Sequence, residues 1–95
     1  MKNLKSLVAA EAVHPGEHLA DELKARFMTQ AELAKLMGKP RSRISELIMG
    51  KAGINAEMAL ALEKALQIEA LWWLNLQARY EVAKLRLAQL HKQAA

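Results

Sequence analysis

Basic and small polar residues gather between Gln30 and Lys51, and the chemistry they suit best is contact with a polyanion. From Lys35 to Lys51 the chain carries five lysines and arginines but only one acid. The net charge of this stretch is therefore +4, which equals the net charge of the whole chain. The remaining residues hold nine positive and nine negative side chains. Concentrated positive charge on an otherwise balanced chain is typical of phosphate binding, so nucleic acid is the expected ligand.

The sequence lacks the groups on which most enzymes depend. It has no cysteine, one aspartate and no glycine-rich phosphate loop, and none of its three serines has a histidine nearby in the sequence. His14 and His18 lie four residues apart, but Pro15 between them disfavours the regular helical spacing that a shared metal would require. We therefore expect no enzyme activity, no metal site and no cofactor.

Two short helices joined by a tight turn are predicted to present the basic cluster. Thr29 and Glu32 form the pattern of a capping box, which starts a helix over about 30–37. Gly38 suits the left-handed residue that ends this helix, and Pro40 suits the first position of the next one. A break of this length is the spacing of a helix-turn-helix.

The second helix of the pair separates an apolar side from a polar side when its residues are placed 100° apart. Ile44, Leu47 and Ile48 share the side that must face a core. The opposite side is expected to lie in the major groove of DNA, with cations at its edges meeting phosphates. Its side chains are Ser42, Ser45, Glu46 and Met49, flanked by Arg41 and Arg43. An ordinary solvated face is the alternative.

Two more polar residues stand beside this helix. Gln30 at the start of the first helix is placed to hold a phosphate together with nearby backbone amides. Lys51, just after the second helix, is a further candidate for phosphate contact. Each is also explained as an exposed side chain without a role.

Composition predicts an all-α chain that forms one domain. Hydrophobic residues make up 53% of the sequence but aromatic ones only 4%, and no stretch alternates as a strand does. Three further helices are expected, over about 17–27, 56–66 and 70–91. The stripes expected to be buried outside the last helix are Leu19, Leu23 and Phe27; Leu33, Leu36 and Met37; and Met58, Ala59, Leu62 and Leu66.

The chain divides into an arm over 1–12, a DNA-binding core over 13–67 and a C-terminal helix over 68–95. The arm is faintly like a signal peptide, but its apolar run is too short and is interrupted by Glu11. No segment approaches the roughly 18 apolar residues of a membrane span. The expected location is the cytoplasm.

The last helix carries more apolar surface than this chain can cover. Two neighbouring stripes run along it, one through Trp73 and Tyr80 and one through Leu71 and Leu85. Only part of this surface can pack on the core, so we expect a partner. A second copy suits a DNA-reading module, because a two-fold dimer presents two reading helices about 34 Å apart to a palindromic site. The predicted dimer interface is Trp73, Leu76, Tyr80, Ala83 and Leu87.

A membrane-surface role for this helix is the alternative to a dimer. Its polar face mixes Glu81 with Arg79, Lys84 and Arg86 instead of being wholly basic. We therefore expect no membrane partner.

The chain resembles the HigA-type antitoxins, also called the virulence-associated protein I type, within the Xre/lambda-repressor-like helix-turn-helix proteins. The resemblance covers 14–80 and rests on the order of HPGE, TQAELAKLMG, RSRISELI, GINAEMALALEKAL and WLNLQARY. It implies a five-helix domain that dimerises through its C-terminal part. It also implies a protein toxin partner, usually a ribosome-dependent mRNA endonuclease, which the antitoxin neutralises while repressing their shared operon.

The resemblance also implies roles for single residues. It places groove contacts at Arg41, Ser42 and Ser45, and phosphate contacts at Gln30, Lys39 and Arg43. The helix geometry adds Glu46, which can accept a hydrogen bond from a cytosine amine or pair with Arg43.

Two residues depart from the family pattern, and both lie beside the reading helix. Pro40 stands where a serine cap is frequent, and Met49 where asparagine is common. The DNA-reading residues by themselves leave two other functions open. One is a phage-type or metabolic repressor without a toxin, and the other is a protein-interaction module that has lost DNA binding.

Overall fold

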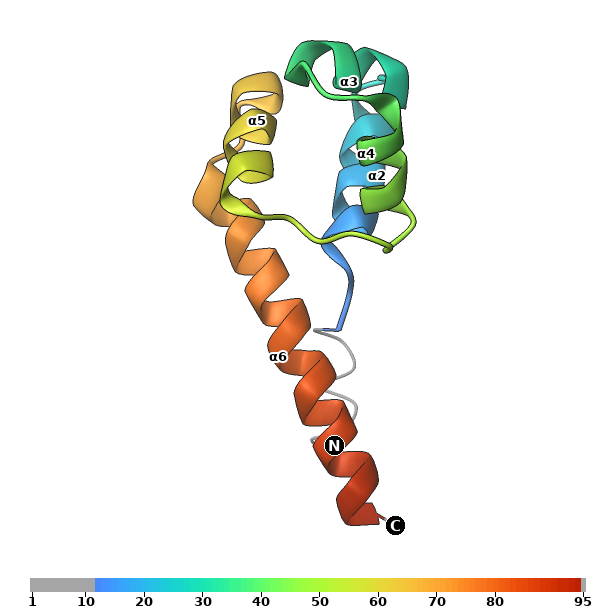
Figure 1. The fold of residues 1–95 in the computed structure, drawn as a ribbon, viewed down its shortest axis with the longest axis vertical. Helices are drawn as coiled ribbons and strands as arrows, with labels where there is room; N and C mark the ends of the chain where they lie inside the picture. Colours follow the sequence, from blue (N-terminus) through green and yellow to red (C-terminus); the bar gives the residue numbers. More distant parts are fainter. Residues whose placement is uncertain (1–11, 95) are drawn as a thin grey trace.

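Five α-helices and no strand make up residues 12–94, the part of the chain that the computed structural model describes (Figure 1). The all-α prediction is confirmed, and residues 1–11 of the predicted arm lie outside the described part. The helices are α2 (Pro15–Ala25), α3 (Gln30–Met37), α4 (Arg41–Ile48), α5 (Ala56–Leu66) and α6 (Ala70–Ala94).

Side-chain caps begin three of the helices. The Nδ1 atom of His14 accepts the N–H of Gly16 at 2.9 Å and caps α2. Thr29 and Glu32 form both hydrogen bonds of the predicted capping box at α3. Asn55 caps α5 by accepting the N–H of Met58 at 2.8 Å. These local signals explain why the predicted bounds of α3 and α5 are confirmed.

The turn between α3 and α4 differs from its prediction by one residue. Gly38 ends α3 in the left-handed region at φ 63°, as predicted. Pro40 is the N-cap of α4 and not its first helical residue, because its ψ of 143° is extended. The fixed φ of proline fits both positions, so the sequence cannot separate them.

The core lies where α2, α3, α4 and α5 meet the beginning of α6. Its largest fully buried side chain is Trp73, in the first turn of α6. The core consists of Leu19, Leu23, Leu33, Ala34, Ile44, Leu47, Ile54, Met58, Ala59, Leu62, Leu66 and Trp73. The predicted inward stripe of α5 is fully confirmed.

Two residues predicted to be buried are exposed. Phe27 is 95% exposed because α2 ends at Ala25 and Phe27 itself has a φ of 54°, so helical spacing no longer places it. Leu36 is 57% exposed. It lies about 100° from the centre of the side formed by Leu33, Ala34 and Met37, at 100° per residue.

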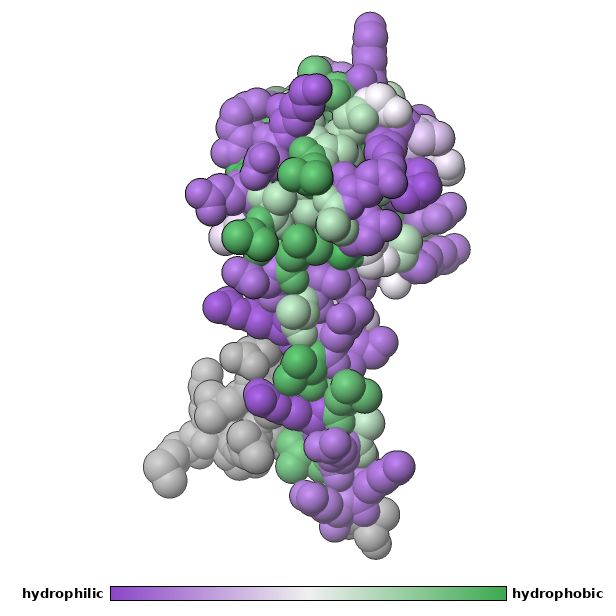
Figure 2. Space-filling view, turned by 60° about the vertical axis from the view of Figure 1, so that its left-hand side comes forward, coloured by the Kyte–Doolittle hydropathy of each residue, from purple (hydrophilic) through white to green (hydrophobic). Residues whose placement is uncertain are grey.

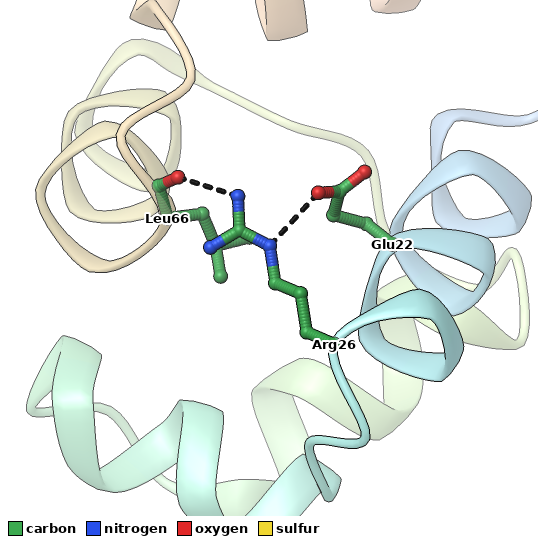
Figure 3. Close-up of polar contacts among 3 residues, drawn as sticks. All are labelled: Glu22, Arg26 and Leu66. Carbon is green, nitrogen blue, oxygen red and sulfur yellow. Dashed lines mark hydrogen bonds and ion pairs between the residues drawn. The ribbon is translucent and has the colours of Figure 1, made fainter.

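A hydrogen-bonded arginine ties the end of α2 to the end of α5. The Nη2 atom of Arg26 donates to the carbonyl oxygen of Leu66 at 2.7 Å, and its Nε atom pairs with Glu22 at 2.8 Å (Figure 3). We call the packed body formed by α2, α3, α4, α5 and the first turns of α6 the head of the molecule. The Arg26 contact lies at the end of the head that is remote from the α4–α5 loop (Figure 1).

The helix α6 begins in the head and continues beyond it as a stalk (Figure 1). Its first turns pack on α2 and α5, and the molecule measures 47 × 24 × 21 Å. The helix continues three residues past its predicted end at about 91. None of the described helices combines the length and apolar character required to cross a membrane.

Candidate nucleic-acid interface

The polar side of α4 faces outward, as predicted. Ile44 and Leu47 are buried on the opposite side and anchor the helix on α2 and α3. Of the predicted base-reading residues, Arg41, Ser42, Glu46 and Met49 are exposed and Ser45 is half-buried. The helix therefore presents its polar and cationic side chains together to an external ligand.

The start of α2 holds α4 at very close range. Gly16 is buried, and a Cβ atom there would stand 1.9 Å from the carbonyl oxygen of Leu47. Only glycine permits this approach, since any side chain would push α4 outward. His14 and Gly16 therefore give the HPGE stretch a physical role in positioning the exposed helix.

The arginines of α4 take part in no ion pair within the described part of the chain, although the charge of Arg43 acts on Glu57 and helps to lower the pKa of that carboxyl. The two ion pairs of the described part join Arg26 to Glu22 and Lys39 to Glu57, so Arg41 takes part in neither. No ion pair joins Glu46 to Arg43 among residues 12–94, which leaves Glu46 able to accept a hydrogen bond from a ligand.

The first turn of α4 is open to an anion. Pro40 provides no side-chain cap and the turn contains no acid. Its backbone N–H groups and the positive end of the helix dipole therefore add to the charge of Arg41 and Arg43.

Lys39 forms an ion pair with Glu57, a residue that sequence analysis missed. Its Nζ atom donates to a carboxylate oxygen of Glu57 in the first turn of α5. This hydrogen bond, with the positive charge of Lys39, lowers the pKa of the Glu57 carboxyl. The two residues are 18 positions apart, so helical periodicity gives no signal of the pair. A phosphate contact by Lys39 stays a prediction, and Glu57 competes with it.

The other predicted phosphate contacts lie at the surface. Arg43 and Lys51 are exposed, and Gln30 is half-buried at the first position of α3. The helix α3, which begins with Gln30, packs against α4.

The structure covers most of the predicted dimer stripe on α6 and exposes its neighbour. Trp73 and Ala83 have no exposed surface, so in this chain they offer nothing to a partner. Leu76, Tyr80 and Leu87 are half-buried.

The neighbouring stripe of α6 remains open. A band of apolar surface follows the helix from the head downward (Figure 2). Leu71 is 67% exposed, Val82 44% and Leu85 66%. Leu74 and Ala78 fall between them on the same side of the helix.

Gln77 is a second residue whose position sequence analysis missed. Its Oε1 atom accepts the N–H of Ile54, 23 residues earlier, at 2.8 Å. The one sequence signal is a glutamine among the apolar residues at the start of α6, which is a polar side chain in need of a partner.

Comparison with known proteins gives consistent matches. A family model described as helix-turn-helix matches residues 19–73. Virulence-associated protein I of Dichelobacter nodosus is 38% identical over 84 residues, which cover 87% of this chain and 75% of that protein.

Solved structures match over most of the chain. The structure of an addiction module antidote protein of a HigA family from Coxiella burnetii has a TM-score of 0.75 and 36% identity, covering 85% of this chain and 88% of that one. The antitoxin HigA of Pseudomonas aeruginosa, solved with the higBA promoter, has a TM-score of 0.77 and 31% identity. That match covers 84% of this chain and 88% of the antitoxin.

Proposed function

This chain belongs to the HigA-type antitoxins of the helix-turn-helix family, and we propose that it binds a palindromic operator, represses its own operon and neutralises a cognate mRNA-cleaving toxin. The observation that carries the DNA part is the exposed side of α4, where Arg41 and Arg43 take part in no ion pair within residues 12–94. The antitoxin solved with promoter DNA supports the same ligand. We propose the cytoplasm as the location, because operator DNA is found there.

Base reading is assigned to the middle of the exposed side of α4 and phosphate binding to its edges. Ser42, Ser45 and Glu46 offer hydrogen-bonding groups to base edges, and Met49 offers an apolar contact for a thymine methyl group. Arg41 is also assigned to base reading. Phosphate contacts are assigned to Gln30, Lys39, Arg43 and Lys51.

A homodimer is the proposed form that binds DNA. The surface we assign to it is the outer stripe of α6, which comprises Leu71, Leu74, Ala78, Val82 and Leu85. The interface predicted from the sequence stays the alternative, and we favour the outer stripe because it is the more exposed of the two. An apolar band along a helix that extends beyond its own head is suited to pairing with the same helix of a second copy.

The first test is titration of the purified protein with its own promoter duplex and a scrambled duplex over a range of salt. Tight, selective binding with a steep salt slope is expected. Arg41→Ala should cost about 1 to 3 kcal/mol on the operator and change base preference, whereas Lys51→Ala should weaken binding to both duplexes alike. Equal losses on both duplexes for Arg41→Ala would remove its base-reading role.

The toxin part needs a separate test. Co-expression with a small endonuclease encoded beside this chain should restore growth that the endonuclease alone arrests. Operator binding without such rescue would favour a repressor that has no toxin partner. Rescue without operator binding would favour an interaction module that has lost its DNA ligand.

A further inference from the structure

The helix α6 leaves the head between Gln77 and Tyr80, and both residues contact the head there. Before this point α6 is fixed by the buried Trp73. After it, about 14 residues continue beyond the head, which at 1.5 Å per residue is a length of about 21 Å. The contacts of Gln77 and Tyr80 therefore act at the base of a long lever.

Gln77 lies directly against the backbone that follows the reading helix. Its Oε1 atom accepts the N–H of the buried Ile54 at 2.8 Å. At Gly53, a Cβ atom would stand 2.9 Å from the Nε2 atom of Gln77 and 3.0 Å from its Oε1 atom. The loop between α4 and α5 can approach the amide this closely because position 53 has no side chain.

One turn further along α6, an acid orients this amide. The Nε2 atom of Gln77 donates to Glu81 at 3.2 Å. Glu81 therefore favours the amide orientation in which Oε1 points to the loop. The hydrogen bond to Ile54 is the polar link that joins α6 to the α4–α5 loop among residues 12–94.

Tyr80 adds a contact with the start of α2. Its ring meets the imidazole of His14 edge to face, with ring centroids 4.8 Å apart. His14 caps α2, whose Gly16 is in contact with the end of α4. The two contacts thus connect the base of the lever to both segments that hold the reading helix.

A small rotation at the base of the lever matters because of its length. A swing of about 10° moves the far end of a lever of about 21 Å by about 3.7 Å. This displacement is close to the rise of one base pair, about 3.4 Å. In a dimer built on α6, such a swing would change the distance between the two reading helices.

We propose that Gln77 is a positioning residue that fixes the direction of α6 relative to α4 and so sets the spacing of operator half-sites that the dimer accepts. The inference rests on the proposed dimer and its operator. It assigns to Gln77 no contact with DNA or with the partner copy.

The first experiment measures the distance between the two reading helices in free protein. Ser42→Cys introduces the only cysteine of the chain, so one nitroxide per copy gives one distance by pulsed electron resonance. We expect a narrow distribution in this parent and a broad one after Gln77→Met, which removes the acceptor and keeps the length of the side chain. The double change Gln77→Glu with Glu81→Gln exchanges acceptor and donor at unchanged net charge and should restore the narrow distribution.

A second experiment uses unlabelled protein and operators whose half-sites are moved by one base pair. Each added base pair shifts a half-site by about 3.4 Å and rotates it by about 35°. The unsubstituted protein should lose about tenfold or more in affinity, and Gln77→Met about threefold or less. Arg26→Met is the matched control, since it deletes a tertiary hydrogen bond at the opposite side of the head and should leave the spacing preference unchanged.

The outcomes separate this inference from the proposed function. A narrow distribution and an unchanged spacing preference in Gln77→Met would overturn the role of Gln77 and leave the dimer intact. An effect of equal size in Arg26→Met would also overturn it, because loss of stability would then explain both. Absence of dipolar coupling in the parent would overturn the proposed dimer and this inference together.

Discussion

At the scale of single residues, the charge beside the exposed side of α4 is adjusted by a neighbour from another helix. Glu57 holds Lys39, whereas the arginines of α4 take part in no ion pair among residues 12–94. To contact the phosphate that the family resemblance assigns to it, Lys39 must therefore give up its ion pair with Glu57. If Lys39 contacts a phosphate as predicted, the Glu57 carboxylate reduces the electrostatic gain from that contact.

Removal of this carboxylate should strengthen DNA binding. Glu57→Gln releases Lys39 for a phosphate, so affinity for any duplex should rise and the slope of log K against log salt should steepen by about one. Asp21→Asn makes the same change of charge on α2, away from Lys39, and is the control. An equal gain in both variants, measured by salt-dependent titration, would point to net charge instead of the freed lysine.

Phe27 is unfavourable for the folded chain in both its backbone conformation and its exposure to solvent. It adopts a φ of 54° and is 95% exposed, so it gains little from packing in this chain. Phe27→Gly should raise the free energy of unfolding by about 1 kcal/mol, because glycine adopts the left-handed region without a steric cost.

Thermal unfolding provides the measurement for Phe27. The midpoint should rise by about 4 to 8 °C for each kcal/mol in a domain of this size. Gln67→Gly, at the other left-handed position with a φ of 58°, should show a gain of the same sign. A loss of stability in Phe27→Gly alone would mean that the aromatic ring makes a stabilising contact.

At the scale of elements, the cap of α2 links stability to pH. Burial lowers the pKa of His14 from its ordinary value of 6.5, more strongly than the backbone of Ala52 and the charge of Glu17 raise it. Lys84 adds to the lowering. The folded chain therefore favours the neutral imidazole, whose Nδ1 atom accepts the N–H of Gly16.

Stability should fall as the pH decreases through about 6.5. Above this value His14 is neutral in the folded and the unfolded chain, and below it the unfolded chain binds a proton that the folded chain resists. Urea unfolding at pH 7.5 and 5.5 measures the loss. His14→Asn keeps an acceptor for the cap and cannot titrate, so its loss should be smaller. The same loss in His14→Asn would assign the pH dependence to other groups.

At the scale of the whole molecule, the proposed dimer depends on the stalk formed by α6. An apolar band continues along the helix beyond the head (Figure 2), and Val82 and Leu85 are the members of the outer stripe on that part of the helix. Its central position on the stalk is occupied by Leu85, while Leu87 lies on the half-buried stripe. The two leucines, two residues apart on one helix, distinguish the alternative interfaces.

Leu85→Glu should weaken the dimer far more than Leu87→Glu. A charge buried in an apolar interface, together with the lost leucine contact, should raise the dissociation constant by about 100-fold or more. Sedimentation across micromolar concentrations measures both variants. The reverse order would return the interface to Trp73, Leu76, Tyr80, Ala83 and Leu87, and a monomer without any substitution would remove the dimer.

The sequence by itself determined the order of the helices, the bounds of α3 and α5 and the polar side of α4. These features depend on neighbours within about four residues, as Thr29 with Glu32 and Asn55 with Met58 illustrate. The helical repeat then fixes which residues of one element share a side. For this reason the reading side of α4 was predicted as the structure has it.

Only the tertiary structure decided which stripe of α6 is covered, where Phe27 lies and which partners Lys39 and Gln77 take. Both stripes of α6 satisfy the helical repeat equally well, and the choice depends on how α2 and α5 pack against it. Phe27 left its stripe because the helix ended two residues earlier. The contacts of Lys39 and Gln77 span 18 and 23 residues, and such separations are set by packing of whole elements, which no local pattern encodes.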